Sequence, residues 1–175
     1  MRDSGVQNAL RRTGAAGDTL RMTDTHRPSD DDARALADAL LRGATHGALG
    51  TLDGGAPMVT RAGVLWLTGQ GVGMLLSDLS DHARALRIDP AASLLVGEAG
   101  PRGDPLTHPR LTLVGRAVLL DKAFWRDRWL AARPKAALYY DFADFHLWCL
   151  RPDRALLNAG FGRAYRLAPA DLGLP

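Results

Sequence analysis

The sequence predicts a mainly β, α+β domain in which antiparallel strands form a barrel with flanking helices. Short apolar runs separated by glycine- and proline-containing turns recur between residues 48 and 157. Helical periodicity is confined to a few segments, and neither an internal repeat nor a linker interrupts the pattern. Meandering strands with few helices between them are typical of antiparallel barrels.

The first 28 residues differ in composition from the rest. They are rich in glycine, arginine, threonine and aspartate and show no apolar period, so we expect a disordered extension over 1–28. Residues 29–175 are predicted to form a single domain, a normal size for one core. Met22 is an alternative start to Met1, on composition alone.

The first element is an amphipathic helix over about 30–45. Ser29 is expected to be its N-cap, and the aspartates at 30–32 follow where the helix dipole favours negative charge. Gly43 and Gly47 mark the exit. The apolar residues at helical spacing are Ala33, Leu36, Ala37, Leu40, Leu41 and Ala44.

Strands follow in order, bounded by turn signals such as Gly54-Gly55 and Thr68 to Gly71. Ser80 is expected to cap a short helix ending near Ile88, and Asp121 a second one, with a further helical turn over 134–140. The expected strands cover residues 48–53, 57–67, 72–76, 92–98, 111–120, 145–150 and 155–157.

Charge and apolar patterning exclude several classes of protein. The net charge is only +3, and the basic residues are spread along the chain among 19 acidic ones, which disfavours nucleic-acid binding. No apolar run reaches the length of a membrane span, and no signal core occurs near Met1. The single cysteine, Cys149, permits no intrachain disulfide and fits a cytoplasmic location; we interpret it as a small buried hydrophobe.

Two regions carry residues suited to binding an anion. Ser77, His82 and Arg84 surround a strand-to-helix corner, where unpaired N–H groups and cationic side chains suit a phosphate monoester. An ordinary capped helix with a solvated arginine is the alternative. Thr60-Arg61 lies in an apolar strand, where the guanidinium either binds a phosphate or faces solvent. Arg110 poses the same question.

A third feature is Asn158 to Ala164, in which two glycines flank an aromatic residue. Close backbone approach to a ligand, a dimer partner and a tight bend all remain possible explanations. The five histidines show no paired metal spacing, so no metal site is expected. A Gly-x-Ser-x-Gly elbow is also missing from the sequence, and we assign no catalytic residue.

The order of motifs resembles the haem-utilisation (HugZ-type) branch of the FMN-binding split barrels, relatives of pyridoxamine 5′-phosphate oxidase. The stretches that carry the resemblance span about 47–167 and are specific in their order and spacing. They are 47–53 with Pro57, 75–84 with 89–95, 103–106 with 109–115, and 134–139, 141–145 and 158–164.

This resemblance implies a six-stranded antiparallel split β-barrel with Greek-key topology. It also implies a homodimer with FMN bound at the interface, the phosphate held by the second strand and by the turn after the third. We expect apolar barrel residues such as Leu111, Leu113 and Trp148 in that interface. The residues at the matching cofactor positions are Thr60, Arg61, Ser77, His82, Arg84 and Arg110.

Departures from the family pattern limit the expected activity. His82 stands where the vitamin oxidases carry lysine, and their element that grips the vitamin phosphate is missing. The chain is therefore not expected to be a true pyridoxamine 5′-phosphate oxidase. Ending at Pro175, it resembles a short form without the C-terminal domain that supplies a haem-ligating histidine in some longer relatives.

Three functional hypotheses follow from the resemblance. The first is an FMN-dependent oxidoreductase acting on an unknown small molecule. The second is haem binding or haem breakdown on the same dimer, with His82, His108 or His146 as candidate ligands. The third is a flavin-binding module without catalysis.

Overall fold

The computed structural model describes residues 26–175, and the predictions for 1–25, including the choice between Met1 and Met22, lie outside the described residues. The N–H of Arg27 donates to the carbonyl of Ala164 at 2.9 Å, and Arg27 forms an isolated bridge with Tyr165. No helix in this part of the chain is long and apolar enough to cross a membrane.

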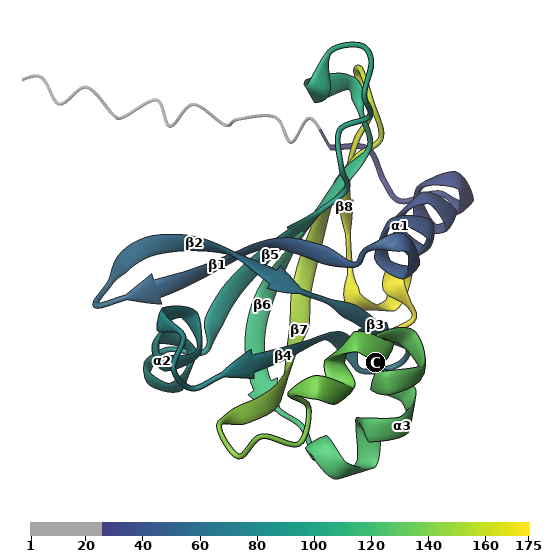
Figure 1. The fold of residues 1–175 in the computed structure, drawn as a ribbon. Coiled ribbons are helices and arrows are strands. Elements are labelled where there is room, and N and C mark those ends of the chain that lie inside the picture. The colour runs from purple at the N-terminus through teal and green to yellow at the C-terminus, as the bar shows by residue number, and fades with distance from the viewer. Residues whose placement is uncertain (1–25) are drawn as a thin grey trace, which may run out of the picture.

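The described residues form one curled antiparallel sheet of eight strands with helices around it (Figure 1), which confirms the mainly β prediction. The strand order is β2-β1-β5-β6-β7-β4-β3, with β8 also pairing with β7. The strands are β1 (His46–Asp53), β2 (Ala56–Gly63), β3 (Leu65–Leu67), β4 (Gly71–Ser77), β5 (Ala91–Val96), β6 (Arg110–Leu119), β7 (Phe145–Asn158) and β8 (Ala164–Leu167). The helices are α1 (Asp31–Gly43), α2 (Asp81–Ile88) and α3 (Lys122–Ala132), with 3-10 turns η1 (Pro105–Thr107), η2 (Pro134–Leu138) and η3 (Pro169–Leu172).

A break at Val64 splits the expected strand 57–67 into β2 and β3. The N–H of Val64 leaves the ladder and donates to the carbonyl of Thr45 at 3.0 Å. β2 and β3 stand at opposite ends of the strand order although one residue separates them in the chain. The sheet must therefore curl until its two edges approach each other, which gives the split-barrel shape.

β7 covers both of the strands predicted separately at 145–150 and 155–157, and it continues through Pro152. The β6–β7 register shifts between Val114 and Gly115, so the proline, which has no N–H, lies at an irregularity of the ladder. A Cβ on Gly115 would lie 2.1 Å from the carbonyl oxygen of Arg151, so only glycine fits there. β8 was not predicted; its buried Tyr165 and Leu167 extend the sheet alongside β7.

The helix caps differ in part from expectation. Asp30, not Ser29, is the N-cap of α1, and its carboxylate accepts from the N–H of Ala33 at 2.7 Å. The prediction of Ser29 was wrong because its hydroxyl donates to Asp171 instead, 2.8 Å away. Asp121 caps α3 as predicted. Ser80 is the N-cap residue of α2, but its side chain makes no capping hydrogen bond.

The main core fills the curled sheet, with a smaller cluster under α3 around Trp129. Leu111, Leu113 and Trp148 belong to the main core, where they are 0%, 0% and 4% exposed. The expectation that these three residues form a dimer interface was therefore wrong, because the chain buries them within its own fold. Cys149 is fully buried, as predicted.

Candidate functional site

Three neighbouring strands bring polar and apolar side chains together on the outer face of the sheet, opposite the buried Leu49 and Leu94. In the ladder Ala48 of β1 pairs with Arg61 of β2 on one side and with Leu95 of β5 on the other. Cross-strand partners point to the same face, so these three side chains lie in a row on the outer face.

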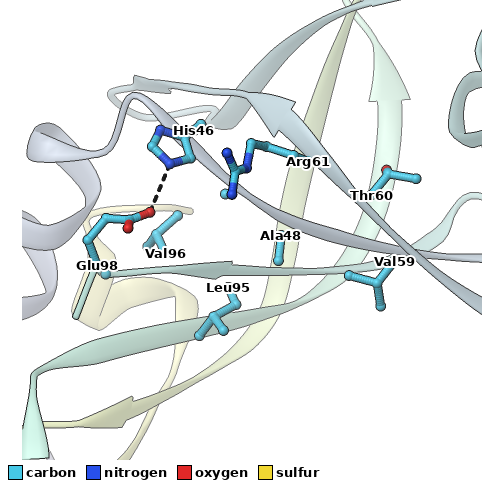
Figure 2. Close-up of a pocket in the computed structure, with 10 residues that line it drawn as sticks. His46, Ala48, Val59, Thr60, Arg61, Leu95, Val96 and Glu98 are labelled. Carbon is cyan, nitrogen blue, oxygen red and sulfur yellow. Dashed lines mark ion pairs between the residues drawn. The ribbon is translucent and has the colours of Figure 1, made fainter. Parts of the chain in front are cut away.

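A cavity of about 300 Å³, the Arg61 pocket, opens on this face (Figure 2). The small or apolar residues of three strands line it below, and charged groups stand at its rim. Its lining residues are His46, Gly47, Ala48, Val59, Thr60, Arg61, Leu95, Val96, Gly97 and Glu98.

Arg61 is the exposed cation of this pocket. Within residues 26–175 it makes no hydrogen bond or ion pair. A guanidinium presents a planar fork of donors that binds carboxylate and phosphate oxygens in pairs. An unpaired arginine above an apolar surface therefore suits a ligand that is apolar in one part and anionic in another.

His46 and Glu98 form the other side of the rim. Nε2 of His46 lies 2.8 Å from Oε1 of Glu98, and Nδ1 lies 3.0 Å from the hydroxyl of Thr45. Figure 2 shows the imidazole and the Arg61 guanidinium beside each other, with Glu98 below the histidine. Neither His46 nor Glu98 was predicted from the sequence to bind a ligand. The signal was the two-residue spacing that puts His46 on the same face of β1 as Ala48.

Thr60 and His82 meet on the other side of β2. The Thr60 hydroxyl lies 3.0 Å from Nδ1 of His82, in the first turn of α2. Burial lowers the pKa of His82 below its usual value, and the neighbouring Asp81 carboxylate offsets part of that shift. The two predicted residues are thus in contact, while Arg61, next along the strand, faces the outer pocket.

Ser77 and Arg84 meet at the turn before α2, through the backbone of Leu79. The hydroxyl of Ser77 accepts from the Leu79 N–H at 3.1 Å and donates to Asp144 at 2.5 Å. The Arg84 guanidinium donates to the Leu79 carbonyl at 2.8 Å and pairs with Asp81. Both side chains therefore hold the turn in place.

Arg110 lies apart from both groups, at the start of β6. Its guanidinium donates to the carbonyls of Leu106 at 2.8 Å and His108 at 3.4 Å, and so closes the loop between β5 and β6. The six predicted cofactor residues thus occupy three places. Arg61 lies in the Arg61 pocket, the outer pocket of the sheet, and Arg110 lies in this loop. The other four surround the start of α2, here called the α2 corner: Thr60, Ser77, His82 and Arg84.

The histidines proposed from sequence as haem ligands lie outside the Arg61 pocket. Nε2 of His108 is 2.9 Å from the carbonyl of Arg102, and Nε2 of His146 is 2.9 Å from the Asp78 carboxylate. The Arg87 guanidinium, first, and then His146 hold the pKa of Asp78 below its usual range. Among residues 26–175, no three His, Cys, Asp or Glu side chains cluster as a metal site.

Comparison with known proteins identifies the family. The family model described as pyridoxamine 5′-phosphate oxidase matches residues 34–159. A curated relative, "Heme oxygenase HutZ" of Vibrio cholerae, is 29% identical over 110 residues. That match covers 59% of this chain and 62% of the relative, so the chain spans about three-fifths of its length.

Solved structures give the same result. A heme binding protein from Mycobacterium smegmatis is 30% identical with a TM-score of 0.74, over 84% of this chain and 61% of that one. A protein of unknown function from Agrobacterium tumefaciens is 32% identical with a TM-score of 0.73, over 82% and 61%. Campylobacter jejuni ChuZ, 18% identical with a TM-score of 0.73 over 85% and 63%, shares the fold.

Proposed function

The chain belongs to the pyridoxamine 5′-phosphate oxidase family, in its HugZ-type branch, and from that premise we propose that it is a haem-binding protein. The observation that carries the proposal is the unpaired Arg61 above the apolar residues of the outer pocket. The V. cholerae and M. smegmatis relatives, 29% and 30% identical, both carry haem in their names. Those names support haem as the ligand.

The residues of the pocket fit this ligand. Haem is a flat, apolar macrocycle with two carboxylate side chains, and Val59 and Leu95 offer exposed apolar surface beneath it. Arg61 would bind a propionate through charge-assisted hydrogen bonds. Bound haem supplies redox and oxygen chemistry, while the protein holds and orients it.

The pocket is open on one side, which supports the further proposal of a homodimer that covers it. Val59 is 71% exposed and Leu95 39% exposed on the same face. A second hollow, of about 310 Å³, continues along it past Pro57, Met58 and Val114. We expect the protein to have the mass of a dimer in solution and Val59→Asp to shift it toward the monomer. A monomeric wild-type protein would contradict this part of the proposal.

Haemin titration of the purified protein, followed by visible absorption, tests the proposed function. We expect saturable binding, and Arg61→Ala should weaken it by about 1.5–3 kcal/mol, the contribution of a hydrogen bond to a charged group. Arg84→Ala is the matched control, because its guanidinium already pairs with Asp81 outside the pocket. No haemin uptake, or equal affinity for wild type and Arg61→Ala, would refute the assignment.

The second candidate is an FMN-dependent oxidoreductase of unknown substrate, or a flavin-binding module without catalysis. Its support is the α2 corner, where Thr60, Ser77 and His82 surround a helix start whose Ser80 side chain makes no cap. Backbone N–H groups at a helix start suit a phosphate. Denaturing the purified protein and identifying released flavin tests this candidate. Reduction of bound FMN by NAD(P)H separates the enzyme from the module.

A further inference from the structure

We propose that His46 supplies the side chain that binds the haem iron, through Nε2, and that Glu98 is an exchangeable partner of that nitrogen. This inference rests on the proposed haem function. Its first support is location: His46 is the histidine among the residues lining the Arg61 pocket, whereas His82, His108 and His146 lie elsewhere. Figure 2 shows Nε2, the nitrogen joined by the dashed line, on the Glu98 side of the ring.

The second support is the arrangement around the other ring nitrogen. Metal-binding histidines usually donate their second N–H to a nearby acceptor, which fixes the tautomer and the ring orientation. Nδ1 of His46 lies 3.0 Å from the Thr45 hydroxyl, which can accept such a hydrogen bond. With the proton on Nδ1, the lone pair is on Nε2, the nitrogen proposed to bind the iron.

The backbone that carries His46 is held from two sides. The carbonyl of Thr45 accepts from the N–H of Val64 at 3.0 Å. The Arg133 guanidinium donates to the carbonyl of Ala44 at 3.0 Å and to that of Val64 at 2.7 Å. A side chain binds a metal most tightly when its backbone is already fixed before binding. These three hydrogen bonds give His46 such a position at the start of β1.

Glu98 can leave Nε2 at little cost. Its side chain is 78% exposed and that of His46 is 38% exposed, and ion pairs open to solvent contribute little to stability. If iron bound at Nε2, an Fe–Nε2 bond would replace an Nε2–H bond, and that proton would be released to water as Glu98 turned away. Nδ1 would keep its own proton, and no electron would be transferred.

The test compares wild type with His46→Ala, His46→Gln and Glu98→Gln, each loaded with haemin. The readouts are the visible and electron paramagnetic resonance spectra, which report the iron ligand, together with the dissociation constant. We expect the two His46 variants to lose the histidine-ligated signature and at least tenfold in affinity. Added imidazole should restore the signature in His46→Ala. Glu98→Gln should keep the wild-type spectrum, as should the matched control His108→Ala.

The outcomes separate this inference from the function it rests on. If wild type takes up no haemin, the haem proposal itself fails. If wild type binds haemin and the two His46 variants give the same spectra as wild type, only the ligand assignment fails. If Glu98→Gln loses the histidine signature, Glu98 is not an exchangeable partner and that half of the inference is overturned. His46→Gln keeps a polar side chain toward Glu98, so it guards against a folding defect in His46→Ala.

Discussion

The hydroxyl of Thr60 and Nδ1 of His82 lie 3.0 Å apart and join edge strand β2 to the first turn of α2. The contact crosses 22 residues of sequence and is partly buried. It is the one place where two of the residues predicted from the family pattern touch through their side chains within the described part of the chain. It therefore links the stability of the barrel edge to the corner where a flavin phosphate is proposed to bind.

Thr60→Val should destabilise the fold by about 0.5–1.5 kcal/mol, the usual net contribution of one hydrogen bond. Valine keeps the shape and the β-branch of threonine, so the loss reports the hydrogen bond. Urea unfolding of wild type and variant measures the difference in the free energy of unfolding. An unchanged midpoint would mean that water replaces the hydroxyl at no cost.

The lowered pKa of His82 predicts that stability falls as the solution becomes acidic. Burial is the main cause of this shift, so the folded state takes up the proton at lower pH than the unfolded state does. Below the unfolded pKa of about 6.5 the unfolded chain binds more protons, and the free energy of unfolding decreases. Unfolding curves between pH 8 and 5 check this. His82→Gln should flatten the pH dependence; an equal slope in the variant would assign it to other groups.

Gly115→Ala should destabilise the protein by more than about 1–3 kcal/mol, the usual cost of overpacking. The added methyl would meet backbone atoms, the Arg151 carbonyl oxygen at 2.1 Å and the Pro152 Cα at 2.7 Å, which cannot move away cheaply. Gly43→Ala is the matched control, because nothing lies within 4 Å of a Cβ there. Thermal unfolding of both variants gives the comparison, and equal melting temperatures would contradict the packing argument.

Cys149 should not react with thiol reagents in the folded protein. Burial raises the pKa of its thiol to about 12, so almost no thiolate is present near neutral pH. Ellman's reagent at pH 8 should show no fast reaction until denaturant is added, and then one thiol per chain. Rapid reaction of the native protein would show that β7 opens locally.

Arg61→Ala and Arg84→Ala should separate the two cofactor candidates. The sequence placed both arginines on FMN, with an expected loss of about 1.5–3 kcal/mol for each. The structure puts Arg61 in the outer pocket and Arg84 at the α2 corner. Haem affinity should depend on Arg61 and FMN affinity on Arg84, measured by titration of each variant with each cofactor. If neither variant changes either affinity, both site assignments fail.

Local signals predicted most of the elements, and long-range pairing decided the rest. Ser29 and Asp30 are neighbours, and both are residue types that cap helices well. Only the hydrogen bond of Ser29 to distant Asp171 leaves Asp30 as the N-cap. Pro152 argues locally for a strand end, yet the register shift opposite it lets β7 continue. β8 lies beyond the glycine-rich segment and is a strand because β7 pairs with it.

The candidate site was predictable in composition but not in arrangement. Because side chains alternate between the two faces of a strand, Thr60 and Arg61 must face opposite ways. Only the pairing of Ala48 with Arg61 and Leu95 shows that Arg61 is the one that faces the pocket. Arg84 and Arg110 carry the charge expected of a ligand contact, but both bind backbone carbonyls nearby. His46 was missed because its partner, Glu98, is 52 residues away in sequence, a pairing that only the fold creates.

The central position of β7 has a consequence for biosynthesis. β4 and β6 both pair with it, and residues 145–158 leave the ribosome only after both of those strands have been made. Until then, the growing chain presents open edges that can pair with other chains. Folding of the sheet must therefore wait until residues 145–158 have been made. Slower synthesis before residue 145, or less chaperone at that stage, should send more of the protein into inclusion bodies.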